Sequence, residues 1–171
     1  MDNNELKLSL RVATDGDKIL LKNLQQLYLH DLSAYTENLD LNAEGVFENN
    51  DIALFYEKSE LIPLMIEYGK AVVGFILFTT PPYTLQGTDY TIGDFFILRK
   101  YRGRGLGKII VKELFQTYPG KYTMMQLIDN QTAISFWKKV LSENGLEYEE
   151  KETMDGDDKC YLQMFEVGKD E

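Results

Sequence analysis

The chain has 171 residues and is poor in the side chains that build metal sites and disulfide frameworks. It holds one cysteine, Cys160, and one histidine, His30. A single thiol excludes an internal disulfide, and the two residues are too few for a Cys/His zinc site. The acidic run 155–158 lacks the glutamate and glycine placement of a calcium loop, so it predicts a hairpin turn. We expect no metal cofactor and a reducing compartment.

Long apolar runs are missing as well. No stretch reaches the roughly 20 residues that cross a bilayer, and the first residues, Met-Asp-Asn-Asn-Glu, are acidic where a secretion signal is basic. Basic residues number 18 against 28 acidic ones, for a net charge of −10. This balance disfavours nucleic acid and suits a cationic acceptor such as an amine. We expect a cytoplasmic protein that binds neither membranes nor nucleic acids.

The remaining composition is that of an ordinary folded domain. Apolar residues make up 44% and aromatic residues 12% of the chain, which is enough to bury a core. No repeat, linker or low-complexity tract interrupts it. We predict one domain over residues 1–171, with a core at about 7–167, and we leave monomer and homodimer both open.

The few basic residues are concentrated in one segment. Residues 99–108 read Arg-Lys-Tyr-Arg-Gly-Arg-Gly-Leu-Gly-Lys and lie between an apolar run and a helix-like pattern. Glycines let backbone amides crowd around an anion, and a helix start adds unpaired N–H groups and a positive dipole end. Cations at a helix start are unfavourable by roughly 0.3–1 kcal/mol each, so Arg104 and Lys108 indicate a bound phosphate.

Two common phosphate loops do not fit this segment. Gly103 and Gly107 are separated by one residue fewer than a P-loop requires, and no hydroxyl residue follows Lys108. The dinucleotide-binding pattern requires glycine at position 108, and no βαβ unit opens the chain. The pattern that remains, Arg102-x-x-Gly105-x-Gly107, resembles the coenzyme A pyrophosphate loop of the GNAT superfamily of N-acetyltransferases.

A second segment strengthens this resemblance, which covers about residues 7–167. Residues 130–137 read Asn-Gln-Thr-Ala-Ile-Ser-Phe-Trp and resemble the Asn-x-x-Ala-x-x-Phe-Tyr helix of the same family. Asn130 suits a helix N-cap, and the apolar residues that follow form one helical stripe. Such a stripe is more often typical of a core helix than of a ligand-binding wall, although the small Ala133 would let a ligand approach closely.

The resemblance implies that acetyl-CoA is bound by both segments and by the strand that precedes the first. The implied residues are the main chain of Phe96, Ile97 and Leu98, the loop residues Arg102, Gly103, Arg104, Gly105, Leu106, Gly107 and Lys108, and Asn130, Ala133 and Trp137.

The fold class that we predict is α+β. Hydrophobic patterns predict strands at 6–12, 62–68, 71–79, 88–98, 122–128, 146–154 and 159–167. They also predict a helix capped by Asp15 and a short helix near 43–48. The GNAT resemblance implies a mostly antiparallel sheet of six to seven strands, with helices on both faces. In that fold the strand ending at Leu98 and the strand starting at Tyr122 splay into a central V-shaped cleft.

The implied reaction transfers an acetyl group from acetyl-CoA to a primary amine of a small molecule by direct attack. The amine must lose a proton, because an alkylammonium has a pKa near 10. Asp94 is the predicted base, on a face expected to hold Tyr90, Ile92 and Phe96. Glu67 and Asp31 are alternatives. A protein acetyltransferase for lysine or N-terminal amines and a non-catalytic acyl-CoA-binding module are the alternative functions.

The departing thiolate raises a separate question. Trp137 stands where many members of the family carry a tyrosine that protonates it. An indole N–H donates a hydrogen bond but does not release its proton. Tyr122 is the predicted replacement acid, with Tyr90 as the second candidate. A thiol with a pKa of about 8.5 can also leave without an acid.

Overall fold

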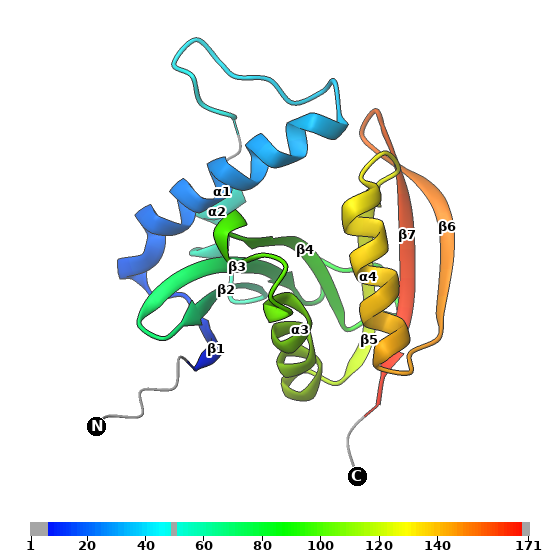
Figure 1. Cartoon of the computed structure of the whole chain (residues 1–171). Helices are drawn as coiled ribbons and strands as arrows, with labels where there is room; N and C mark the ends of the chain where they lie inside the picture. The colour runs from blue at the N-terminus through cyan, green and yellow to red at the C-terminus, as the bar shows by residue number, and fades with distance from the viewer. Residues whose placement is uncertain (1–6, 49–50, 169–171) are drawn as a thin grey trace, which may run out of the picture.

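The computed structural model describes residues 7–48 and 51–168, which form one mixed sheet with helices on both faces (Figure 1). The strand order is β1-β2-β3-β4-β5-β7-β6. The strands are β1 (Leu8–Val12), β2 (Leu61–Tyr68), β3 (Ala71–Thr79), β4 (Tyr90–Ile97), β5 (Gly120–Leu127), β6 (Tyr148–Asp155) and β7 (Asp158–Val167). This arrangement confirms the predicted fold class.

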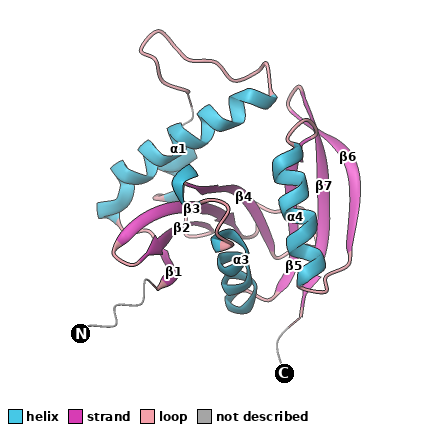
Figure 2. Cartoon of the chain, in the orientation of Figure 1, coloured by secondary structure: helices cyan, strands magenta, loops and turns pink. Residues whose placement is uncertain are grey.

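Two helices cover each face of the sheet (Figure 2). Helices α1 (Lys18–Leu32) and α2 (Asp51–Phe55) pack on one face, and α3 (Leu106–Thr117) and α4 (Gln131–Glu143) pack on the other. Amphipathic stripes explain this, since each helix buries its apolar side in one of two hydrophobic clusters. In the described part of the chain, every helix is too short or too polar to cross a bilayer.

Strands β4 and β5 are parallel neighbours, but they pair over only part of their length. Their register runs from Tyr90 opposite Tyr122 to Ile92 opposite Met124 and then stops. The remainder of β4 keeps its antiparallel partner β3 and has no pairing with β5. The predicted V-shaped splay is therefore present, and it opens beyond Ile92.

A β-bulge lies where the splay begins. Ile76 of β3 is opposite Phe95, whereas Phe78 is opposite Ile92, so β4 has one residue more than β3 over this stretch. The extra residue reverses the alternation of side chains. Phe96 packs in the cluster under α1, whereas Ile92 packs in the cluster under α3 and α4. The expectation that Asp94 shares a face with Tyr90 and Ile92 is therefore wrong, because simple alternation ignores the bulge.

Gly74 of β3 allows the close approach of β4 at this point. A Cβ atom built on Gly74 would lie 2.0 Å from the Phe96 carbonyl oxygen. No side chain can be accommodated at that distance from backbone, so glycine is required for the two strands to pair here. The position of the splayed half of β4 thus depends on a residue in its neighbour.

Most predicted strands are confirmed to within two or three residues, with Leu6 outside the described residues. The helix predicted near 43–48 is wrong. The Asn42 side chain accepts hydrogen bonds from the N–H groups of Glu44 and Val46, each at 3.0 Å, and this local bonding replaces a helical turn. The cap predicted at Asp15 is also wrong. Asp15 lies in a 3-10 turn, Asp15–Asp17, that is capped by Thr14, and the N-cap of α1 is Asp17, whose carboxylate accepts the Thr14 N–H.

Candidate active site

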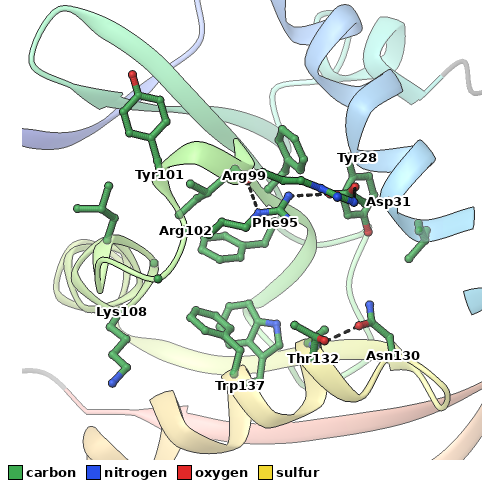
Figure 3. Close-up of a pocket in the computed structure, with 18 of the residues that line it drawn as sticks. Tyr28, Asp31, Phe95, Arg99, Tyr101, Arg102, Lys108, Asn130, Thr132 and Trp137 are labelled. Atoms are coloured by element: carbon green, nitrogen blue, oxygen red, sulfur yellow. Dashed lines mark hydrogen bonds and ion pairs between the residues drawn. The ribbon is translucent and has the colours of Figure 1, made fainter. Parts of the chain in front are cut away.

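A cavity of about 490 Å³ opens at the splay between β4 and β5 (Figure 3). Its walls come from the end of α1, the open half of β4, the glycine loop before α3 and the start of α4. It is lined by Tyr28, Asp31, Leu32, Ala34, Tyr35, Phe95, Phe96, Ile97, Arg99, Tyr101, Arg102, Gly103, Gly105, Leu106, Gly107, Lys108, Asn130, Thr132, Ala133, Phe136 and Trp137. The two segments singled out in the sequence therefore meet at one site.

The glycine loop presents unpaired backbone donors to this cavity. Gly103 and Gly105 have φ angles of +73° and +77°, a conformation that favours glycine, and Gly105 is the N-cap of α3. After Arg102, Ile109 is the next residue whose N–H has a backbone acceptor, and it donates to the Gly105 carbonyl at 3.3 Å. Within the described residues, the N–H groups of residues 103–108 have no acceptor. The loop and helix start thus form an open nest for an anion.

Arg102 is turned away from that nest. Its Nε donates to the Ile97 carbonyl at 2.6 Å, and its Nη2 donates to Asp31 at 2.6 Å. Its backbone N–H donates to the Arg99 carbonyl at 3.1 Å. The Nε and Nη2 groups of Arg102 are thus engaged within the protein, while Arg102 lines the cavity, so its part in binding coenzyme A stays a prediction.

Asp31, at the end of α1, binds two guanidinium groups. Arg99 and Arg102 each donate to one of its carboxylate oxygens at 2.6 Å (Figure 3). Partial burial acts to raise the pKa of Asp31, but the hydrogen bonds from Arg102 and Arg99 outweigh it and lower the pKa. A carboxylate held in this way is a poor base, so the alternative role predicted for Asp31 is not supported. The sequence offers no signal that links residues so far apart.

The other two cations of the predicted site lie differently. The Arg104 guanidinium lies 5.7 Å from the Tyr101 ring centroid and, among the described residues, has no acidic partner. Lys108 donates to Glu143 of α4 at 2.9 Å, which raises the pKa of Lys108. Arg104 is therefore the loop cation without an ion pair, although it is not part of the cavity lining, and Lys108 joins α3 to α4.

Only part of the predicted main-chain contact at β4 is available. The Leu98 N–H donates to the Val73 carbonyl of β3 at 2.8 Å. Since main-chain groups alternate along a strand, those of Phe96 also face β3, while those of Phe95 and Ile97 face the open side. The structure supports Ile97, contradicts main-chain binding by Phe96 and Leu98, and adds Phe95. The Ile97 carbonyl is occupied by Arg102, so its N–H is the free group.

The second segment forms the opposite wall as predicted. Asn130 Oδ1 accepts the Ala133 N–H at 3.1 Å, which confirms the N-cap. Ala133 and Phe136 line the cavity. Trp137 packs against Phe95 and Phe136 with ring centroids 5.3 and 5.1 Å apart, and 6% of its surface is exposed. The nitrogen edge of its indole faces the cavity (Figure 3).

Asp94 lies behind the cavity wall. Gln25 Nε2 donates to Asp94 Oδ2 at 3.1 Å, and burial raises the pKa of Asp94 to about 6. Burial and the nearby charge of Asp94 raise the pKa of Tyr28 well above its usual value. Tyr28 itself lines the cavity. Tyr28 is therefore a neighbour of Asp94 that lines the cavity, whereas Asp94 itself does not. Glu67 is paired with Arg11 at 2.8 Å and lies outside the cavity lining.

Tyr122 is in the wrong place for an acid. Its side chain has 0% exposure, stacks on Phe165 with ring centroids 5.2 Å apart, and donates to the Tyr118 carbonyl at 2.5 Å. Burial raises the pKa of Tyr122 far above its usual value. It lies at the closed end of the V, where β4 and β5 still pair. The role predicted for Tyr122 is therefore contradicted, and Tyr90 stacks beside it in the same cluster.

A contact at the other end of the cavity could not be found from sequence. Thr36 Oγ1 and Asn38 Nδ2 donate to Asp158 Oδ1 at 2.7 and 2.9 Å. These bonds tie the loop after α1 to the turn between β6 and β7. Tyr35, which precedes Thr36, lines the cavity. We call this contact the loop latch. The acidic turn was predicted, but its partner more than 100 residues away was not.

Comparisons with known proteins identify the family of this chain. A family model described as the acetyltransferase (GNAT) family matches residues 22–142, a range that includes the glycine loop and most of α4. The chain therefore belongs to the GNAT family of acetyltransferases, which confirms the predicted enzyme class, an acyltransferase. A comparison with curated proteins found no match.

Solved structures share the fold at low sequence identity. The yncA protein of Salmonella typhimurium, solved with its cofactor acetyl-CoA, is 14% identical with a TM-score of 0.61, covering 94% of both chains. Arabidopsis thaliana Naa50, solved with the bisubstrate analogue CoA-Ac-MVNAL, is 18% identical with a TM-score of 0.58, covering 92% of this chain and 97% of that one. The diaminobutyrate acetyltransferase EctA of Paenibacillus lautus, solved with L-2,4-diaminobutyric acid and coenzyme A, is 14% identical with a TM-score of 0.58, covering 95% and 96%.

Proposed function

We propose that this protein transfers an acetyl group from acetyl-CoA to a primary amine of a small molecule. The observation that carries the proposal is the set of unpartnered N–H groups at residues 103–108, beside the open half of β4. The Salmonella and Paenibacillus neighbours, solved with acetyl-CoA and coenzyme A, support the same donor. In this proposal the nest binds the diphosphate, with Arg104 as its cation.

The open edge of β4 suits the arm of the donor. Phe95 and Ile97 direct main-chain groups toward the gap, and a pantetheine arm carries amides that can pair with them. The small side chain of Ala133 leaves room on the opposite wall. An N–H of β4 can stabilise the oxygen of the thioester carbonyl as negative charge develops there. No side chain is needed for that step.

Asp94 is the proposed base. With a pKa of about 6 it is ionised at neutral pH, yet it remains more basic than an ordinary carboxylate. Asp94 does not line the cavity itself, whereas Tyr28 does. Asp94 would therefore take the proton of the amine through Tyr28 or a water molecule. In this proposal the amine binds on the side of the cavity where Tyr28 and Asp94 lie.

The loop latch favours a small acceptor. It holds the segment around Tyr35 against the β6–β7 turn, at the end of the cavity away from the glycine loop. A long peptide lying through the V would need that segment to move. The Arabidopsis neighbour solved with CoA-Ac-MVNAL represents the alternative of a peptide acceptor.

An acceptor screen tests the proposal. Calorimetry should show coenzyme A binding, and thiol release from acetyl-CoA should occur with members of a panel of polyamines, aminoglycosides and amino acids, and not with short peptides. Asp158→Ala, which removes the latch, should raise the KM for the amine several-fold, whereas Asp157→Ala, in the same exposed turn, should not. Turnover with peptides alone would support the protein acetyltransferase. Binding without any turnover would support the non-catalytic module.

A further inference from the structure

Two arginines share one carboxylate on the wall of the cavity. Asp31 of α1 accepts a hydrogen bond from Arg99 on one oxygen and from Arg102 on the other, each at 2.6 Å (Figure 3). All three side chains line the cavity. We call these three residues the arginine clamp. Its two positive charges and one negative charge leave a surplus of positive charge, which an anionic group of a ligand would balance.

The two guanidinium groups of the clamp are not equally engaged. Arg102 donates through Nε to the Ile97 carbonyl at 2.6 Å, and its guanidinium carbon lies 5.3 Å from the centre of the Phe96 ring. Among the described residues, the Arg99 side chain has a single acceptor, Asp31, which takes its Nη2. The Nε and Nη1 groups of Arg99 are therefore left for a ligand. Arg102 is fixed by its contacts, and Arg99 is the residue with unused donors.

Arg11, outside the cavity lining, shows the opposite arrangement. Its Nε donates to Glu67 at 2.8 Å, and its Nη1 and Nη2 donate to Asp17 at 2.6 and 3.1 Å. All three nitrogens of this guanidinium have an acceptor, and two carboxylates surround one positive charge. Arg11 is therefore used fully within the protein. The clamp reverses this balance of charge inside the cavity, as a subsite for a negatively charged group requires.

The clamp lies beside the part of the cavity that we assign to the acceptor. Tyr28, Asp31 and Tyr35 follow one another along the end of α1 and the turn after it, and all three line the cavity. Tyr28 is a neighbour of the proposed base, Asp94. Residues three apart on a helix have Cβ atoms about 5–6 Å apart, so Tyr28 and Asp31 are neighbours on one face of α1. A small acceptor that carries both an amine and an anionic group can contact both residues' surroundings at once.

We propose that Arg99, positioned by Asp31, binds a carboxylate of the acceptor, so that the acceptor is an amino acid or a related small molecule with both groups. The inference rests on the proposed function, because it assigns the second group of the same acceptor. A guanidinium fork matches the two oxygens of a carboxylate, which a single ammonium does not. Asp31 holds the two guanidinium groups side by side, so the Arg99 fork stays at the cavity wall.

Matched acceptors provide the test. Free amino acids are compared with their carboxamides, which keep the amine and the carbon skeleton and lose the negative charge. In the wild type, the best free amino acid should have a kcat/KM about tenfold or more above that of its amide, the gain typical of charge-assisted hydrogen bonds. Arg99→Gln should remove most of this preference by raising the KM of the free acid. The Arg99 side chain is 75% exposed, so the variant should fold.

Lys100→Gln is the matched control, because it removes a neighbouring charge that lies outside the cavity lining. It should keep the wild-type preference, and calorimetry should find the same coenzyme A affinity in both variants.

Equal turnover of an amino acid and its amide by the wild type, or turnover of polyamines alone, would overturn the inference and leave the proposed function in place. Weaker coenzyme A binding in Arg99→Gln, with the preference for the free acid unchanged, would assign the clamp to a phosphate of the donor and would also overturn it. An absence of turnover with every amine would overturn the proposed function, and the inference with it.

Discussion

The two ends of β4 show how one strand serves both as core and as candidate active site. At its first half, Tyr90 lies beside Tyr122 in a stack of aromatic rings, and β4 pairs on both edges. At its second half, Phe95 and Ile97 keep one edge unpaired and line the cavity. Both halves are apolar and aromatic in sequence. The difference comes from the bulge and from the loss of pairing with β5.

This comparison teaches that position along the V, and not burial, separates the aromatic residues, since Tyr122 and Trp137 are both buried but only Trp137 lines the cavity. The hydroxyl of Tyr122 donates to the Tyr118 carbonyl, whereas the N–H of Trp137 has no acceptor among residues 7–48 and 51–168. The carboxylate of Asp94 lies at the bulge, between the two halves, and takes its raised pKa from that position. Four substitutions test the contrast, beginning with the largest expected effect.

Asp94→Asn should lower kcat by about 10²–10⁴-fold, the usual contribution of a general base. In the wild type, activity should rise as pH increases through about 6, because the ionised carboxylate accepts the proton. The variant should lack this rise. Steady-state rates from pH 5 to 9 provide the measurement, and an unchanged pH profile in the variant would remove Asp94 from the mechanism.

For the same variant we predict a gain in folding stability at neutral pH, in contrast to its loss of kcat. The folded-state pKa of Asp94 lies above its unfolded value of 3.8, so its favourable contribution is present below about pH 4 and lost as pH rises through about 6. Asp94→Asn removes the ionisation, so at pH 7 the variant should unfold at higher denaturant concentration than the wild type. The gain should shrink at pH 4.

Gly105→Asp should weaken coenzyme A binding by roughly 100-fold. It places a carboxylate among amides that are free for a phosphate, and losing hydrogen bonds to a charged group costs about 1.5–3 kcal/mol. Gly105→Asn is the matched control, because asparagine tolerates the φ of +77° and carries no charge. Calorimetry should find the asparagine variant much closer to wild type. Equal affinities in all three proteins would refute the anion nest.

Gly74→Ala should lower the free energy of unfolding by about 3 kcal/mol, at the upper end of overpacking penalties. The added Cβ would lie 2.0 Å from the Phe96 carbonyl oxygen, so β3 and β4 must separate at the open half. Gly45→Ala is a control in open space, although its positive φ brings some strain of its own. Chemical denaturation gives the comparison, and a variant as stable as the control would contradict the close approach.

Tyr122→Phe should have the smallest effect. It leaves the Tyr118 carbonyl without its hydrogen bond, which costs about 1–3 kcal/mol of stability, and it leaves the ring stack in place. The value of kcat should not change, because Tyr122 lies outside the cavity lining. Rates and denaturation curves on the same samples separate these effects. A large loss of kcat in a stable variant would restore Tyr122 as the acid.

Residue pattern alone predicted most of the local features of this protein correctly. The strands, the glycine turn before α3 and the Asn130 cap of α4 depend on contacts between residues close in sequence, so hydrophobic spacing and capping preferences reveal them. The helix near 43–48 was wrong because the Asn42 side chain formed a competing local turn.

The tertiary structure decided which predicted side chains meet at the cavity. A one-residue bulge places Asp94 on the face of the sheet that α1 covers, and the Arg102 side chain hydrogen-bonds to Asp31. The latch at Asp158 likewise joins distant segments. Sequence determines periodicity and turns because these arise within a few residues. Which donors and acceptors of the site remain without a partner in the protein depends on the groups that folding brings next to them. These contacts exist only once the sheet has assembled.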